Sequence, residues 1–317
     1  MIQTKLFAGI DLGGTNIKSG LVSRDGDIQL EKNVPSETEG GVHHVLDRMA
    51  ACVKDTMREL GEGITVKGVG VGVAGLVEYE KGLLHEAPNL PGWSKVPVKA
   101  ELEKRLKMDV FVDNDANLAA LGEYAFGAGQ GITEMLMVTL GTGVGGGLIL
   151  RGEIYHGAIG AAGEFGHITV QLDGPVCGCG RRGCVEAFVG TQGILRSVQE
   201  KLDSGRKSLL EEIDPGQRTP KDVSRAARND DAVAIEVLAE VGTYLGAGMG
   251  NVANLLNIQR VVVGGGVAKA GDFILKPARK GLQRVALETS AKSIEVVPAM
   301  LGTKAGLVGA ARMAMDN

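Results

Sequence analysis

The stretch Gly20-Leu21-Val22-Ser23-Arg24-Asp25-Gly26-Asp27-Ile28 recurs, with one deletion, as Gly147-Leu148-Ile149-Leu150-Arg151-Gly152-Glu153-Ile154. Both copies read glycine, an aliphatic pair, arginine, a turn glycine, an acid and isoleucine. Each follows an apolar segment and a glycine-rich turn. A repeated pattern in a repeated context predicts a duplicated unit, so we expect two related α/β domains.

The segments around the repeat alternate between short apolar runs and amphipathic stretches. We expect strands over 6–9, 17–22, 28–34, 66–73, 110–112, 135–140, 148–150, 260–263 and 294–297. Apolar residues at helical spacing predict helices over 41–60, 97–107, 116–124, 231–256, 273–285 and 304–315. The polar segment 203–222 holds two prolines and predicts a surface loop without chemistry.

The composition is that of a globular protein with an excess of glycine. The 317 residues are 44% hydrophobic and 23% charged, and the 49 glycines are roughly double the usual share of ~7%. The net charge of −4 disfavours a nucleic-acid partner, and the N-terminus does not resemble a signal peptide. We therefore expect a cytoplasmic protein that binds neither nucleic acid nor a membrane.

One segment, 237–256, is apolar enough to be considered as a membrane span. It carries Glu240 and four glycines, so a buried helix of a soluble protein is the better interpretation. Gly242, Gly246 and Gly250 recur every four residues and share one helix face. We expect this face to pack closely against another helix.

Two glycine-rich turns occupy matching places in the two halves. Asp11-Leu12-Gly13-Gly14-Thr15 lets the backbone approach an anion, while Thr15 adds a hydroxyl donor and Asp11 can hold Mg²⁺. Gly141-Thr142-Gly143-Val144-Gly145-Gly146-Gly147 is its counterpart. Alone each is compatible with a plain hairpin, but together they predict loops that clamp a polyphosphate. They are neither a Walker A motif nor a Rossmann fingerprint.

A third cluster, Gly264-Gly265-Gly266, follows a predicted strand and precedes a helix. Its backbone could pack against the adenine or ribose of a nucleotide. A plain strand-to-helix turn explains it equally well.

His167, Cys177, Cys179 and Cys184 form the strongest local signal. Three of the four cysteines lie within eight residues, and a disulfide is disfavoured in a cytosolic chain. A Cys₃His set predicts a structural zinc site rather than free thiols. The fourth cysteine, Cys52, fits the apolar side of its helix and is expected in the core.

Asp113-Asn114-Asp115-Ala116-Asn117 ends a strand and opens a helix. Capping explains some of these polar residues, and we expect Asp113 to act only as a cap. The others suit a ligand crevice, where a carboxylate accepts a proton from a substrate hydroxyl. Glu164 and Glu186 bracket the metal set, so zinc could orient both carboxylates toward a polyol while His167 offers its second nitrogen.

The ordered motifs resemble those of the ROK family over residues 5–312. They are Asp11-Leu-Gly-Gly-Thr15, Asn89-Leu-Pro-Gly-Trp93, Asp113-Asn-Asp-Ala-Asn117, Gly163-Glu-Phe-Gly-His167 and Cys177-Gly-Cys-Gly-Arg-Arg-Gly-Cys184-Val-Glu186. The resemblance implies an actin-like, ribonuclease H-like fold of two α/β lobes with a cleft between them. The first lobe would hold residues 1–117 and the returning helix 303–317. The second would hold 118–302 with the zinc loop 167–186.

The same resemblance implies ATP-dependent phosphorylation of glucose at its 6-hydroxyl, with Mg²⁺ as cofactor, as in glycolysis. Asp115 would be the general base. The sugar hydroxyls would be held by Gly75, Asn89, Asn114, Asp115, Glu164, His167 and Glu186. The family also implies a homodimer or homotetramer. Many members carry lysine after the Gly-Gly-Thr, whereas this chain has Asn16, with Lys18 beyond.

Three alternatives stay open at this point. The sugar could be N-acetylmannosamine, mannose or fructose, because the motifs do not fix the substituent at carbon 2. The donor could be polyphosphate, although the acidic balance disfavours a long anionic chain. A sugar-sensing repressor of the same family would need a helix-turn-helix segment, for which we expect no room before Asp11.

Overall fold

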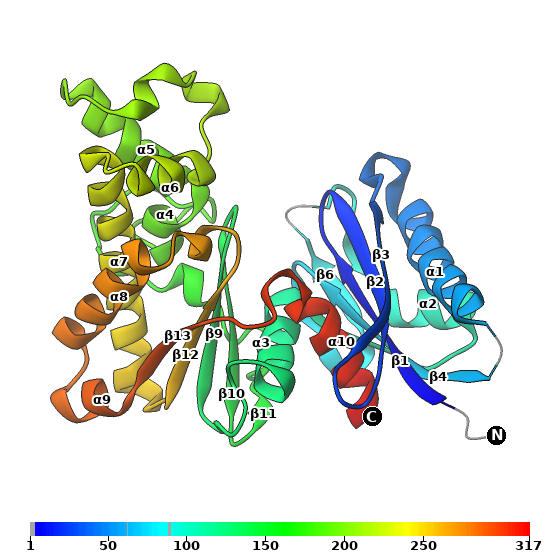
Figure 1. Ribbon diagram of the computed structural model, residues 1–317. Helices are drawn as coiled ribbons and strands as arrows, with labels where there is room; N and C mark the ends of the chain where they lie inside the picture. The colour runs from blue at the N-terminus through cyan, green and yellow to red at the C-terminus, as the bar shows by residue number, and fades with distance from the viewer. Residues whose placement is uncertain (1–3, 62, 88–89) are drawn as a thin grey trace. The chain divides into compact units, whose positions relative to one another are not determined.

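The computed structural model describes residues 4–61, 63–87 and 90–317. The chain forms two compact units, each with strands and helices (Figure 1). Unit 1 comprises Met1–Gly131, Gly147–Gly163 and Met300–Asn317, and unit 2 comprises Ile132–Gly146 and Glu164–Ala299. The predicted α/β class is confirmed.

The sheet of unit 1 has the strand order β3-β2-β1-β4-β8. Its strands are β1 (Thr4–Leu12), β2 (Asn16–Val22), β3 (Ile28–Pro35), β4 (Ile64–Val73) and β8 (Val110–Asn114). The first three form an antiparallel meander, and β4 and β8 run parallel to β1. Helices α1 (Gly41–Leu60) and α2 (Val98–Leu106) cover one face, while α3 (Asp115–Phe126) and α10 (Ala305–Asp316) cover the other (Figure 1).

A second sheet repeats this order as β11-β10-β9-β12-β13. Its strands are β9 (Met135–Leu140), β10 (Val144–Leu150), β11 (Glu153–Ile154), β12 (Arg260–Gly264) and β13 (Glu295–Pro298). Again β10 and β11 form an antiparallel hairpin, while β12 is parallel to β9 and β13. The hairpins β2–β3 and β10–β11 are the two copies of the repeated sequence, so the predicted duplication is confirmed.

Glycines let α10 approach its sheet at backbone distance. A Cβ atom at Gly9 would overlap the carbonyl oxygen of Leu307, and one at Gly70 would overlap that of Ala310. The same holds between α3 and α10, where a Cβ at Gly122 would meet the carbonyl of Ala305. Because α3 packs on α10 in this way, unit 1 continues through α3 to Gly131. The boundary between the units therefore differs from the expected one after residue 117.

The α-helices that the structure describes in unit 2 all follow β10 in the chain. They are α4 (Val185–Val189), α5 (Thr191–Asp203), α6 (Pro220–Arg228), α7 (Ala232–Leu256), α8 (Asp272–Val285) and α9 (Glu288–Ser293). By length and composition α7 could cross a membrane, but 56% of its apolar window is buried within the protein. Gly242 and Gly246 face the backbone of α8, which confirms the predicted helix-packing face.

Some elements lie outside the sequence-based expectations. A three-stranded antiparallel sheet in unit 1 comprises β5 (Leu76–Glu78), β6 (Leu83–Glu86) and β7 (Ser94–Val96). Short 3-10 helices are η1 (Thr38–Gly40), η2 (Tyr79–Lys81), η3 (Phe165–His167), η4 (Leu209–Glu212), η5 (Pro215–Gln217), η6 (Val267–Ala270) and η7 (Gly302–Lys304).

The expectation of a plain surface loop over 203–222 is wrong in detail. The segment contains η4, η5 and the first turn of α6. The buried Arg218 side chain orders it by donating hydrogen bonds to the carbonyl oxygens of Leu210 and Ile213. A guanidinium with five fixed donors can organise a polar stretch that has few apolar residues of its own.

Candidate functional site

The first predicted phosphate loop is the tight turn between β1 and β2. Gly14 and Thr15 are exposed at its tip, and Ser36 Oγ donates to the carbonyl oxygen of Gly14 at 2.8 Å. Asp11 and Lys18 pair across the two strands, with Lys18 Nζ 3.6 Å from Asp11 Oδ2. Burial raises the pKa of Asp11 above its ordinary value, and Lys18 opposes that rise. The N–H of Gly13 already donates to the carbonyl oxygen of Asn16. An anion would therefore approach the exposed tip at Gly14 and Thr15, beside a desolvated carboxylate.

The second predicted loop is shorter than expected, because β10 already begins at Val144. A Cβ atom at Gly141 would meet nothing within 4 Å, so the backbone there borders open space. Thr191 Oγ1 donates to the carbonyl oxygen of Gly141 at 2.9 Å. Thr142 is exposed, and a Cβ at Gly143 would overlap the carboxylate of Glu186. The loop is therefore held from behind and open at its tip.

The third glycine cluster combines a structural turn with an open edge. Gly264 is buried beneath Met137 and Ala299, and Gly265 has φ +92° against the backbone of Leu140. That conformation favours glycine, so Gly265 serves the turn. A Cβ at Gly266 would meet nothing within 4 Å. Of the three, Gly266 leaves the most space for a ligand.

The predicted metal ligands come together in unit 2. One ligand atom from each of His167, Cys177, Cys179 and Cys184 lies within 4.8 Å of the others. Cys177 Sγ is 3.8 Å from His167 Nδ1, and Cys179 Sγ is 3.8 Å from Cys184 Sγ. In a tetrahedral site with bonds of about 2.3 Å, two sulfur ligands are about 3.8 Å apart. The donor set and its spacing fit a zinc ion.

The thiols differ in their environment. Burial raises the pKa of the Cys177 thiol to about 12 and also raises that of Cys184. A backbone hydrogen bond from Arg181 lowers the pKa of the exposed Cys179.

Glu186 links the predicted metal ligands to the second predicted phosphate loop. Its Oε1 accepts a hydrogen bond from Cys177 Sγ at 3.3 Å, and its Oε2 accepts one from the backbone N–H of Val144 at 2.9 Å. On the other side of the metal set, Glu164 Oε2 lies 3.9 Å from His167 Nε2. His167 thus presents Nδ1 to the thiols and Nε2 toward a carboxylate.

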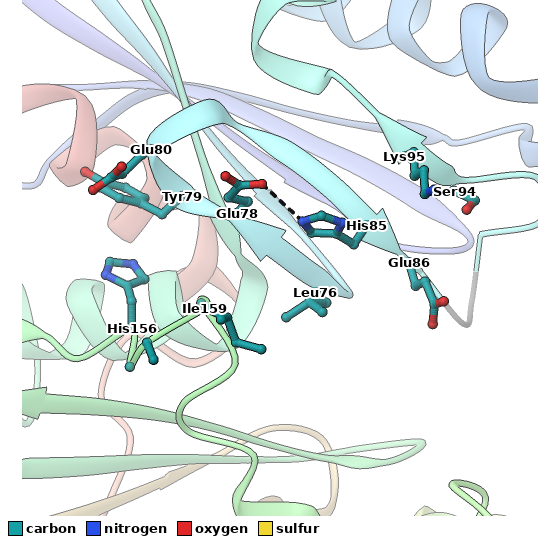
Figure 2. Close-up of a pocket in the computed structure, with 13 residues that line it drawn as sticks. Leu76, Glu78, Tyr79, Glu80, His85, Glu86, Ser94, Lys95, His156 and Ile159 are labelled. Atoms are coloured by element: carbon teal, nitrogen blue, oxygen red, sulfur yellow. Dashed lines mark hydrogen bonds and ion pairs between the residues drawn. The ribbon is translucent and has the colours of Figure 1, made fainter.

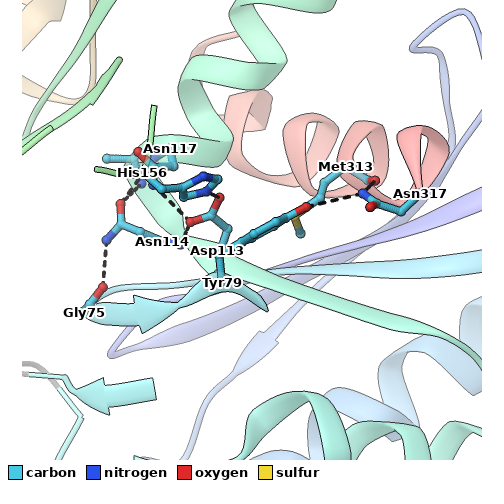
Figure 3. Close-up of polar contacts among 9 residues, drawn as sticks. Gly75, Tyr79, Asp113, Asn114, Asn117, His156, Met313 and Asn317 are labelled. Carbon is cyan, nitrogen blue, oxygen red and sulfur yellow. Dashed lines mark hydrogen bonds and ion pairs between the residues drawn. The ribbon is translucent and has the colours of Figure 1, made fainter. Parts of the chain in front are cut away.

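The polar motif at the start of α3 forms a connected network in unit 1 (Figure 3). Asn114 is the helix cap: its Oδ1 accepts from the N–H groups of Ala116 and Asn117. Its Nδ2 donates to the carbonyl oxygen of Gly75 at 3.0 Å. Asp115 is partly exposed, and its Oδ1 accepts from the N–H of Ala116 at 2.9 Å. The amide of Asn114 is therefore fixed beside a carboxylate that solvent can reach.

Asp113 is not a simple cap, which corrects the expectation. Its side chain is 1% exposed, and it accepts hydrogen bonds from Asn114 N (2.7 Å), Asn117 Nδ2 (3.0 Å) and His156 Nε2 (2.7 Å) (Figure 3). The cap position falls to Asn114 because β8 ends at that residue, two residues beyond the predicted strand over 110–112.

Asn89, a predicted sugar ligand, lies outside the described residues. His156 is a functional candidate that the sequence analysis missed. It stands alone in a loop, and no motif or spacing marks it; only the fold brings it to Asp113.

A cavity of about 800 Å³ in unit 1 lies between the small sheet and the loop that carries His156 (Figure 2). Glu78, Glu86 and Lys95 contribute to its polar wall, and Glu78 pairs with His85 at 3.2 Å. Leu76, one residue after Gly75, is part of its lining. Among the described residues of unit 1, those predicted to bind sugar or phosphate do not line it.

Known proteins are similar to this chain over nearly its whole length. The model of the ROK family matches residues 7–317. The glucokinase of Halalkalibacterium halodurans is 39% identical over 312 residues, covering 97% of this chain and 94% of that protein. The glucokinase of Thermotoga maritima is 35% identical and covers 100% of this chain and 99% of its own length.

A solved structure is similar over the same extent. A ROK family glucokinase from Streptomyces griseus, in complex with glucose and AMPPNP, superposes with a TM-score of 0.84 at 37% identity. The match covers 98% of this chain and 100% of the other. The expected fold is thereby confirmed.

Proposed function

The chain belongs to the ROK family, and from this premise we propose that it is a glucokinase that transfers the γ-phosphoryl group of ATP to the 6-hydroxyl of glucose. The observation that carries the proposal is the full-length likeness to glucokinases, one of them solved with glucose and AMPPNP. Phosphoryl transfer of this kind needs positioning and charge neutralisation more than covalent chemistry.

Asp115 is the proposed general base. It is the partly exposed carboxylate of its motif, whereas Asp113 is buried and already accepts three hydrogen bonds. A base must reach the hydroxyl proton, so Asp113 is unsuited to the role. Asp115 begins α3, where the helix dipole favours its charged, proton-accepting form.

The neighbouring polar groups are proposed to hold the sugar hydroxyls. In unit 1 these are Asn114 and Gly75, which are joined by a hydrogen bond and so present a fixed pair. Asn89 belongs to the same proposal. In unit 2 they are His167, which is itself a proposed metal ligand, and Glu164 and Glu186, which lie beside the ligand set.

The phosphates of ATP are proposed to lie against the glycine loops. Gly14, Thr15 and Thr142 are exposed, and Gly13, Gly141 and Gly143 are partly exposed, so each turn presents backbone and a threonine hydroxyl to solvent. Gly264, Gly265 and Gly266 are proposed to border the nucleoside. Asp11 would hold Mg²⁺, because a desolvated carboxylate is a hard oxygen ligand of the kind that this ion prefers. Bound Mg²⁺ would neutralise phosphate charge.

Zinc is proposed to be structural, held by His167, Cys177, Cys179 and Cys184. The three cysteines lie in the glycine-rich segment 177–184, which has no aliphatic side chain to fix its shape, and His167 comes from η3. Zinc binding would deprotonate Cys177 and so remove its hydrogen bond to Glu186, while the backbone N–H of Val144 would still hold Oε2 of that carboxylate. We further propose a cytoplasmic homo-oligomer that feeds glycolysis.

A substrate panel tests the proposal. Glucose, N-acetylmannosamine, mannose and fructose are each offered with ATP or with polyphosphate, and turnover is read in a coupled assay. The expected result is the highest kcat/KM for glucose with ATP. A higher value for another hexose, or for polyphosphate as donor, would reassign the substrate within the family.

A further inference from the structure

Asp113 gathers three hydrogen bonds from separate places in unit 1. Its Oδ1 accepts from the backbone N–H of Asn114 and from Asn117 Nδ2, and its Oδ2 accepts from His156 Nε2 (Figure 3). The side chain is 1% exposed, so these donors replace the water that an ionised carboxylate would otherwise bind. A buried carboxylate satisfied in this way has one well-defined orientation.

The two donors on Oδ1 lie on either side of Asp115 in the sequence. Asn114 precedes it, and Asn117 is one helical turn into α3. The amide oxygen of the buried Asn117 has no hydrogen-bond partner in the described part of the chain, so its contact with Asp113 is what orients that amide. Asp113 therefore fixes the first turn of α3, on which Asp115 stands.

His156 holds Asp113 from outside this motif. It follows β11, and its carbonyl oxygen accepts from the N–H of Ala162 at 3.1 Å, so its backbone is fixed too. The ring stacks on Tyr79 with centroids 4.5 Å apart and an interplanar angle of 21°. Because a carboxylate oxygen accepts, Nε2 must carry the proton that is donated. The stack keeps the ring in the plane that this bond requires.

We propose that Asp113 and His156 form a positioning pair that sets the orientation of the general base Asp115. The inference rests on the proposed function, since it assigns a role relative to the base of that reaction. His156 Nε2–H holds one oxygen of Asp113, the other oxygen holds Asn114 and Asn117, and these two hold the turn that carries Asp115. Neither member touches the substrate; both act through the base.

Two substitutions at His156 separate the hydrogen bond from the ring. In His156→Leu the donor is lost, while in His156→Gln the amide nitrogen can reach the position of Nε2 and donate to Asp113. Misplacement of a reacting group by about 1 Å can cost about 10²-fold in rate. We expect His156→Leu to lower kcat roughly 10- to 100-fold with the KM for ATP within about twofold, and His156→Gln to restore most of kcat.

His85→Leu is the matched control. His85 also donates Nε2 toward a carboxylate of unit 1, that of Glu78 at 3.2 Å, and its side chain is 37% exposed. His85 has no part in the network at α3, so the kcat of His85→Leu should equal that of the unmodified protein. Circular dichroism and the melting temperature of each variant show which of them are folded.

The proposal is wrong if folded His156→Leu keeps kcat within about twofold of the unmodified enzyme. It is equally wrong if His156→Gln is no better than His156→Leu, since ring packing would then be what matters. Both outcomes leave the glucokinase activity of the unmodified chain intact. Absence of hexose phosphorylation by the unmodified chain would instead overturn the proposed function, and the pair with it.

Discussion

Asp115→Asn and Asp113→Asn should separate catalysis from stability within one motif. Asp115 is partly exposed, and its Oδ1 accepts from the N–H of Ala116, a bond that an asparagine oxygen can also accept. The variant loses mainly the charge at the helix start, worth about 0.3–1 kcal/mol. It also loses the ability to take a proton, which typically contributes about 10²–10⁴-fold. We expect kcat to fall by about that factor with the fold nearly unchanged.

Asp113→Asn should lower the stability of the protein more than it lowers kcat. The buried carboxylate accepts three hydrogen bonds, and each drops from a charge-assisted bond of about 1.5–3 kcal/mol to a neutral one of about 0.5–1.5 kcal/mol. The relief of burying a charge offsets part of this loss. His156 can change tautomer and accept from the new amide. The expected net loss is about 2 kcal/mol, or roughly 4–8 °C in the melting temperature.

Thermal unfolding and steady-state kinetics on glucose decide between these expectations. Calorimetry should show glucose binding to Asp115→Asn weakened far less than kcat, because Asn114 remains to hold the sugar. The reasoning would be refuted if Asp115→Asn kept a near-normal kcat. If Asp115→Asn kept its kcat while Asp113→Asn lost the roughly 10²–10⁴-fold typical of a general base, the base would have to be reassigned to Asp113.

Four further outcomes are expected. The purified protein should hold close to one zinc per chain by elemental analysis. Cys179→Ser, at an exposed position, should lose the metal, sugar affinity and stability together. Full activity of the metal-free protein would contradict this. Gly141→Val places a side chain in open space and should raise the KM for ATP with little change in glucose binding; an unchanged KM would make the loop a plain turn. Asp11→Asn should abolish turnover yet leave the protein at least as stable at pH 7, as denaturant titration can show. Glu123→Gln should cost about 2–4 kcal/mol by the same titration, whereas the exposed Glu39→Gln should cost almost nothing.

Local sequence patterns predicted the parts of this molecule whose causes are local. The helix over 41–60 matches α1 because its apolar spacing lies within the segment and the glycine that ends it, Gly61, follows directly. The predicted metal ligands Cys177, Cys179 and Cys184 lie within eight residues, so only His167 had to be brought to them to form the cluster that the structure shows. The repeated hairpin predicted two copies of one sheet, since both copies meet the same neighbours in the same order.

Contacts between distant segments could not be predicted in this way. His156 reaches Asp113 across 43 positions, and no periodicity connects the two. The strands of the small sheet, 76–96, are three or four residues long, too short for an alternation to stand out. The boundary of unit 1 depended on α3 packing against α10, a contact that close-packed glycines on both helices make possible.

Three carboxylates in unit 1 show how hydrogen-bond donors separate structural acids from functional ones. Asp113 accepts from three donors, and Glu123, which is fully buried, accepts from the N–H groups of Ala128, Met300 and Leu301. Asp11 has Lys18 beside it, 3.6 Å away, and burial still raises its pKa above the ordinary 3.8. Between the unfolded and the folded pKa the native protein binds more protons, so stability falls as the pH rises through that window. Above both values the ionised Asp11 destabilises the fold. If Asp11 holds Mg²⁺ as proposed, Asp11→Asn should flatten this pH dependence and also remove turnover.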